Sequence, residues 1–190
     1  MKVWITLLCF VLGAYAAELK YALEDLTVRE DGLLVETKTL KLANGVGQLF
    51  YESGKIKSET PFKEGIREGV GKTYYESGKL QSETPFKNDK MEGLKKEYYE
   101  SGVVQSELFF VNDEAHGMAK MYYSTGKLQG ETPFKKNKPD GTAKLFSPKT
   151  QLLRTIEFKE GEVVQGFDYD AKGKKKELSK EELIEAIKVF

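Results

Sequence analysis

The stretch Gly65–Thr73, GIREGVGKT, contains the residue types of a phosphate-binding loop. Such a loop needs four residues between its first glycine and the closing Gly-Lys-Ser/Thr, so that backbone N–H groups surround a phosphate at the start of a helix. Counting back from Gly71 places Ile66 where that glycine belongs, and Gly65 lies one residue too early. The residues that follow favour strands and turns. We therefore expect no nucleotide site and no cofactor.

Two further groups of residues could take part in catalysis. His116 is the only histidine, and acidic residues stand at the equivalent places elsewhere in the chain, which is typical of a solvated turn. Glutamates also recur, at Glu59, Glu83, Glu107 and Glu131. On equivalent strands of a sheet they are about 9.6 Å apart, beyond the carboxylate separation of retaining glycosidases and at the edge of the inverting range. We expect no catalytic residue, no metal site and no enzymatic activity.

An internal repeat of 24 residues explains the glycines. A leading glycine recurs at Gly45, Gly69, Gly93, Gly117 and Gly141. Five positions later comes an aromatic column at Phe50, Tyr74, Tyr98, Tyr122 and Phe146. It is followed by a tyrosine column at Tyr51, Tyr75, Tyr99 and Tyr123. A turn glycine, an aliphatic residue and a phenylalanine complete each copy, and the fifth copy lacks the second tyrosine and the turn glycine.

Each copy is interpreted as a β-hairpin that turns at Ser77-Gly78 and its equivalents. This register places Tyr75 opposite Leu80 and Gly69 opposite Phe86, on one face because strand side chains alternate. The predicted structural face comprises Tyr75, Leu80, Phe86, Tyr99, Val104, Phe110, Tyr123, Leu128 and Phe134.

The other face of each hairpin carries opposite charges. Tyr74 is expected opposite Gln81, and Lys72 opposite Glu83. The same lysine–glutamate pair returns as Lys96 with Glu107 and Lys120 with Glu131. Directly opposed charges help to set register, so the lysine of the apparent phosphate loop is predicted to be a cross-strand partner.

The unit GxxKxYYESGKLxSETPFKxxKxEG, carried by residues 69–93, 93–117 and 117–141, resembles the MORN-repeat variant of YwqK-like antitoxin proteins. The resemblance implies an all-β fold, a single-layer antiparallel meander of about five hairpins. It also implies a binding role, which in some members is the neutralisation of a toxin.

The ends of the chain differ from the repeats. Residues 1–16 have the charged start, apolar middle and small-residue cleavage site of a secretory signal peptide, so we expect a secreted or periplasmic protein of a bacterial envelope. Cleavage there would remove Cys9, the only cysteine. Residues 17–44 are predicted to be N-terminal strands or a degenerate half repeat, 45–164 five repeats, 165–178 a final strand or linker, and 179–190 a capping helix. Ser179 and Glu182 form the capping-box signature of that helix, and the apolar stripe Leu183, Ile184, Ile187 and Phe190 has helical spacing.

A single layer of hairpins leaves aromatic surface for a partner. The aromatic column Phe50, Tyr74, Tyr98, Tyr122 and Phe146 lies in polar surroundings, and tyrosines in such surroundings are frequent interface anchors. We predict that this stripe binds a protein partner. Two alternatives are a membrane surface, as in a peripheral or envelope-organising module, and a glycan. The formal net charge of zero argues against nucleic acid and counts against anionic membranes.

Overall fold

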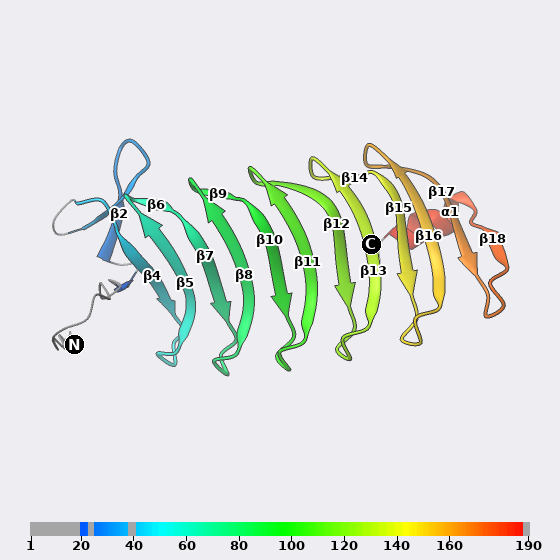
Figure 1. The fold of residues 1–190 in the computed structure, drawn as a ribbon, viewed down its shortest axis with the longest axis horizontal. Helices are drawn as coiled ribbons and strands as arrows, with labels where there is room; N and C mark the ends of the chain where they lie inside the picture. The colour runs from blue at the N-terminus through cyan, green and yellow to red at the C-terminus, as the bar shows by residue number, and fades with distance from the viewer. Residues whose placement is uncertain (1–19, 23–24, 38–40, 188–190) are drawn as a thin grey trace.

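The computed structural model describes residues 20–22, 25–37 and 41–187. Within these ranges the strands lie side by side in one layer, with a short helix at the C-terminal end (Figure 1). The expected all-β meander of hairpins with a terminal helix is confirmed. The predicted signal peptide, residues 1–16, lies outside the described residues.

The strand boundaries follow the repeat. The N-terminal strands are β1 (Lys20–Ala22), β2 (Leu26–Val28) and β3 (Leu34–Glu36). The strands of the first two copies are β4 (Gly45–Phe50), β5 (Ile56–Lys63), β6 (Ile66–Arg67), β7 (Gly69–Tyr74), β8 (Leu80–Lys87) and β9 (Lys90–Met91). Those of the next three are β10 (Gly93–Tyr98), β11 (Val104–Val111), β12 (Glu114–Tyr122), β13 (Leu128–Lys135), β14 (Lys138–Pro139), β15 (Gly141–Phe146) and β16 (Leu152–Lys159). The chain continues with β17 (Glu162–Tyr169), β18 (Lys175–Glu177) and α1 (Lys180–Ala186).

Neighbouring long strands pair in sequence order. The main sheet runs β1-β4-β5-β7-β8-β10-β11-β12-β13-β15-β16-β17-β18, and the short strands β6, β9 and β14 pair with the ends of β5, β8 and β13. All of these pairs are antiparallel except the first, in which β1 lies parallel to β4. Strands β2 and β3 form a separate hairpin. The parallel strand was not expected, because its partner in space lies beyond an intervening hairpin in the sequence.

The predicted register holds along most of each hairpin. In the second copy Lys72 lies opposite Glu83 and Gly69 opposite Phe86. The equivalent charged pairs are Lys96 with Glu107 and Lys120 with Glu131. The cross-strand role of the lysine in the apparent phosphate loop is therefore confirmed.

The turn departs from the expectation. The Tyr75 N–H donates to the Lys79 carbonyl at 2.8 Å, and the Gly78 N–H donates to the Tyr75 carbonyl at 2.8 Å. This is a three-residue loop with Gly78 at φ 88°, the left-handed position that such loops reserve for glycine. The predicted two-residue turn and the pairing of Tyr75 with Leu80 are wrong.

One extra residue restores the register. Leu80 lies opposite Tyr74, and the next pair is Thr73 with Ser82, so Gln81 is a bulge instead of the partner of Tyr74. The longer loop shifts the pairing by one residue and the bulge shifts it back. Val104 and Leu128 likewise lie opposite Tyr98 and Tyr122. The aliphatic column therefore pairs with the aromatic column and not with Tyr75, Tyr99 and Tyr123.

Glycines and phenylalanines mark one face of the sheet, which we call the glycine face. The ring atom Cε2 of Phe86 lies 2.9 Å from the place where a Cβ on Gly71 would be, and Phe62 approaches Gly47 to 2.8 Å in the same way. The ring therefore lies across the glycine two residues beyond its register partner. A bare backbone is what permits this contact.

Both ends of the glycine face are covered. At the N-terminal end Leu26, Ala43 and Phe62 form a buried cluster with Leu34 packed against it. At the C-terminal end the buried cluster consists of Ala143, Ile156, Phe158, Leu178 and Ala186, with Val163 and Leu183 packed against it. The phenylalanine column thus continues into both small cores.

The helix α1 begins with the predicted capping box: the Ser179 hydroxyl accepts from the Glu182 N–H, and the Glu182 carboxylate accepts from the Ser179 N–H. Of the predicted apolar stripe, Leu183 packs on the core while Ile184 and Ile187 are exposed. Phe190 lies outside the described residues.

A glycine comparison tests the repeat junction. Gly93 has φ 121°, and a Cβ on it would lie 3.0 Å from Pro85 Cγ, whereas Gly117 has φ 76° with no atom within 4 Å. We expect Gly93→Ala to lower the free energy of unfolding by about 1–3 kcal/mol, because strained backbone and a close contact add together. Gly117→Ala should cost less. Urea denaturation of both variants measures the difference, and an equal or larger loss for Gly117→Ala would contradict this account of the junction.

Candidate functional site

The face opposite the glycine face, which we call the ladder face, carries a continuous row of alternating charges. Adjacent strands of the sheet place the members of this charge row directly opposite one another, in the order Glu59, Lys72, Glu83, Lys96, Glu107, Lys120, Glu131 and Lys144. Lys96 Nζ lies 3.6 Å from Glu107 Oε1, and Lys144 Nζ lies 2.8 Å from Glu131 Oε1. Each interior charge therefore has an opposite charge on both sides.

The aromatic column lies beside the charge row and is tied to it. The hydroxyl of Tyr98 donates to Glu83 Oε2 at 2.8 Å, one repeat back along the chain. Tyr74 donates to Glu59 at 2.8 Å and Tyr122 to Glu107 at 2.9 Å. These rings are half-buried, and Phe50 is exposed. The structure thus gives the predicted tyrosine stripe a bonding role between repeats, which sequence spacing did not reveal.

These contacts change the acidity of the tyrosines. Burial, followed by the hydrogen bond to Glu83, raises the pKa of Tyr98 to about 12. Burial and the matching glutamate do the same for Tyr74 and Tyr122, whose pKa values are also raised to about 12. Each hydroxyl stays protonated because burial disfavours the charged phenolate and because loss of the proton would place a second negative charge against a carboxylate.

The second tyrosine column joins one repeat to the next at the edge where the three-residue loops lie. The Tyr75 hydroxyl donates to the Tyr98 carbonyl at 2.6 Å. The equivalent bonds run from Tyr51 to Tyr74, from Tyr99 to Tyr122 and from Tyr123 to Phe146. This column was predicted to belong to the structural face, and its hydroxyls bond to backbone across the repeat boundary.

A third row on the ladder face is apolar. Val70, Leu94 and Met118 lie two residues before a lysine of the charge row, and therefore on the same face. Their partners across each hairpin are Pro85, Phe109 and Pro133. Val70, Leu94, Phe109 and Met118 keep between 41% and 47% of their surface exposed. We call these six residues the apolar row. Sequence reasoning missed it, although three members stand two residues before a lysine of the charge row and the other three stand two residues after a glutamate of that row.

The opposite edge of the sheet is built from turns that bond to one another. The Asp89 N–H donates to the Arg67 carbonyl at 3.0 Å, and the Arg67 N–H donates to Asp89 Oδ1 at 3.0 Å. The same two bonds join Met91 to Asp113 and Ala115 to Asn137. The turn edge therefore holds the repeats in step, as the tyrosines do at the other edge.

The acidic residues equivalent to His116 also serve these turns. Glu68 accepts from the Asn88 N–H at 2.9 Å, and Asp140 accepts from the Glu160 N–H at 3.3 Å. His116 stands in this place in the fourth copy, with its Nε2 3.6 Å from Glu114 Oε2. The acidic column is thus a set of turn acceptors.

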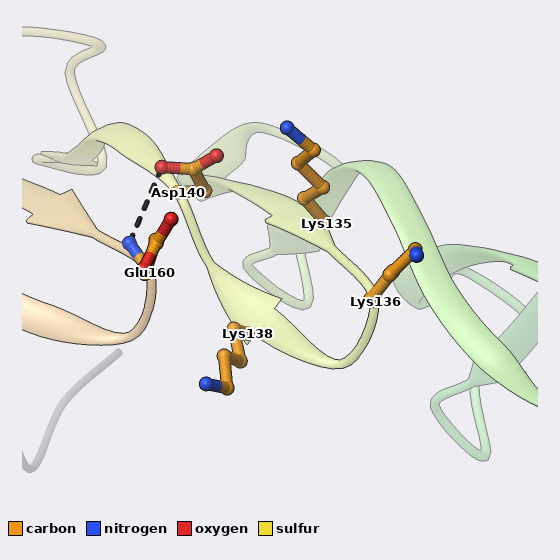
Figure 2. Close-up of a pocket in the computed structure, with 5 residues that line it drawn as sticks. All are labelled: Lys135, Lys136, Lys138, Asp140 and Glu160. Atoms are coloured by element: carbon orange, nitrogen blue, oxygen red, sulfur yellow. Dashed lines mark hydrogen bonds between the residues drawn. The ribbon is translucent and has the colours of Figure 1, made fainter.

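Asp140 and Glu160 line a hollow at this edge together with Lys135, Lys136 and Lys138. Figure 2 shows that the three lysine side chains point in different directions. They do not converge on a point where one anion would sit. The hollow therefore lacks the geometry of an anion site.

Nowhere in 20–22, 25–37 and 41–187 do three His, Cys, Asp or Glu side chains gather in a way that could hold a metal ion. In the same ranges, no helix has the length and apolar character needed to cross a membrane.

Fold and faces together define an open, single-layer solenoid of β-hairpins, in which each copy contacts its neighbours. A family model described as MORN repeat variant matches residues 43–64, 67–88, 91–112 and 115–136. The chain belongs to the MORN-repeat family. No curated protein matches it. The hairpin of β15 and β16, beyond the matched residues, repeats the same register, with Gly141 opposite Phe158.

The raised tyrosine pKa values predict a pH dependence of stability. A tyrosine of the unfolded chain loses its proton near pH 10. Between pH 10 and about 12 the folded protein keeps protons that the unfolded chain has released, so the free energy of unfolding must fall as the pH rises through this window.

The variant Tyr74→Phe/Tyr98→Phe/Tyr122→Phe should show a smaller fall, because phenylalanine has no proton to lose and is already present at the ends of the column. At pH 7 each lost hydrogen bond should cost about 1 kcal/mol. Thermal melts from pH 7 to 12 measure both effects. A triple variant whose stability falls as steeply as that of the wild type would contradict the assignment.

Proposed function

We propose that this protein is an exported, non-enzymatic repeat scaffold that binds a protein partner through its ladder face, in the manner of an antitoxin or immunity protein of the YwqK-like kind. Export is inferred from residues 1–16, and the binding role from the family and from the surface. The observation that carries the proposal is the apolar row, whose four large side chains are exposed beside the charge row and the aromatic column.

The three rows have complementary uses in an interface. Exposed apolar side chains supply the area that becomes buried on binding. Half-buried tyrosines are rigid, since their hydroxyls are already bonded, and ordering them costs little entropy. The alternating charges fix the orientation of the partner, because its own charges must be opposite to those of the charge row at each position. The proposed binding surface is therefore wider than the tyrosine stripe predicted from the sequence, and the stripe forms one side of it.

The alternation also bears on the competing classes of ligand. An anionic membrane attracts clustered lysines and arginines, whereas each interior lysine of the charge row lies between two glutamates. A glycan-binding face requires an aromatic ring free to stack on a sugar. The hydroxyl-bonded tyrosines are only half-exposed, so Phe50 and Phe109 are the rings best placed for such stacking.

Affinity capture tests the proposal. Protein produced from the full chain is used as bait against the envelope and secreted fractions of the source organism, and a captured protein is purified and its affinity measured directly. The variant Leu94→Ser/Phe109→Ser/Met118→Ser should lower that affinity at least tenfold, because it removes the apolar area from the ladder face. The control variant Val28→Ser/Leu49→Ser changes apolar residues that are on average at least as exposed but lie away from this face, and it should bind as the wild type does.

The opposite pattern would contradict the choice of face, namely a partner lost with the control variant and kept with the ladder-face variant. Capture of no protein, together with binding to vesicles of anionic lipid or to glycans, would replace the protein partner with one of the two alternatives.

A further inference from the structure

The charge row is self-complementary. It has eight members that alternate in sign, beginning with a glutamate and ending with a lysine. Reversing the order of such a row turns every negative position into a positive one. A second copy of the same row, laid on it in the reverse direction, therefore places an opposite charge against every charge.

We propose that the ladder face binds the ladder face of a second copy of this chain, about a two-fold axis that runs along the strands between β10 and β11. This operation reverses the order of the strands in the second copy and keeps their direction. Lys96 then lies against Glu107 of the second copy, and Glu107 against its Lys96. Farther out, Glu83 meets Lys120 and Lys72 meets Glu131.

The same axis aligns the apolar row with itself. Leu94 lies against Phe109 of the second copy, Met118 against Pro85 and Val70 against Pro133. Each of these pairs joins two apolar side chains, and the four large ones are exposed in the single chain. Self-complementarity of one patch under a two-fold operation is the requirement for a closed, isologous dimer.

An axis between another pair of neighbouring strands would leave more of the row without a partner, and two other arrangements fail the requirement outright. A two-fold axis along the charge row would place each lysine against the same lysine of the second copy and each glutamate against its like. It would also bring the apolar row against the tyrosines. Stacking through the glycine face is obstructed because β2, β3 and α1 cover its two ends.

The contact is strongest near the axis. Two sheets packed face to face are about 10 Å apart, a gap that lysine and glutamate side chains can bridge from both sides. Sheets twist, so strands far from the axis diverge and contribute less. Lys96, Glu107, Leu94 and Phe109 are therefore the residues on which the dimer depends.

Charge reversal at the axis gives a specific test. In Lys96→Glu the glutamate at position 96 faces Glu107 twice in each dimer, and in Glu107→Lys the lysine at position 107 faces Lys96 twice. Each variant alone should dimerise at least tenfold more weakly than the wild type. An equimolar mixture of the two should recover a heterodimer, because each reversed charge then meets its opposite. Sedimentation equilibrium over a range of protein concentrations measures all four samples.

Lys95→Glu is the matched control. Lys95 is the neighbour of Lys96 on β10 but lies on the glycine face, where its Nζ is 2.7 Å from Glu97 Oε1. The same charge change there should leave the dimer as in the wild type. Wild-type association should weaken with added salt, since charges at an open interface are screened. Phe109→Ser, at an exposed site, should also weaken dimerisation, and it provides the test if a charge variant does not fold.

The proposal is overturned by a wild-type protein that stays monomeric at every concentration. It is equally overturned by a dimer that Lys95→Glu weakens as much as Lys96→Glu does, or by two folded charge variants whose mixture stays monomeric. The inference uses the same face as the proposed function, but its test needs only the purified protein. Failure to dimerise and failure to bind a partner are therefore separate results.

Discussion

Each repeat of this protein is held in place by its neighbours along the chain, because a single layer of hairpins has no second layer to pack against. Backbone pairing between strands is one part of this dependence. The other part is side-chain bonding across each repeat boundary, from Tyr75 to the Tyr98 carbonyl at one edge and between Arg67 and Asp89 at the other. The 24-residue period is what brings each donor to the same acceptor in every copy. Inserting or deleting one residue in a copy would therefore move the bonds between that copy and its neighbours out of register.

The two faces of the sheet are used differently as a result. The glycine face holds the phenylalanines, and its ends are covered by the β2–β3 hairpin and by α1. The ladder face satisfies its polar groups laterally, lysine to glutamate and tyrosine to glutamate, without a covering element. Because the polar groups bond to neighbours within the sheet, no second layer is needed to pair them. The side chains of the apolar row are therefore left exposed. The charge row and the aromatic column therefore stabilise the ladder face and also make its surface suitable for binding.

Much of this architecture could be predicted from the repeat, and the exceptions have identifiable causes. The lysine–glutamate register followed from counting residues on either side of a turn. The pairing of Tyr75 with Leu80 was wrong because two local irregularities cancel: the three-residue loop displaces the register and the bulge at Gln81 restores it. The sequence Glu-Ser-Gly was a sufficient signal for the loop, since its glycine occupies the left-handed position. The bulge has no equally clear signal.

The candidate site was less predictable than the fold. By itself the sequence determined the repeat, the alternation of faces and the charges that pair across each hairpin, because these depend only on spacing along one strand and its partner. The tertiary structure decided that the tyrosines bond to glutamates one repeat away, that both coverings lie on the glycine face, and that the apolar row remains exposed. These features depend on which copies and which ends of the chain meet in space, and that information is carried by the assembled sheet and not by the period of the sequence.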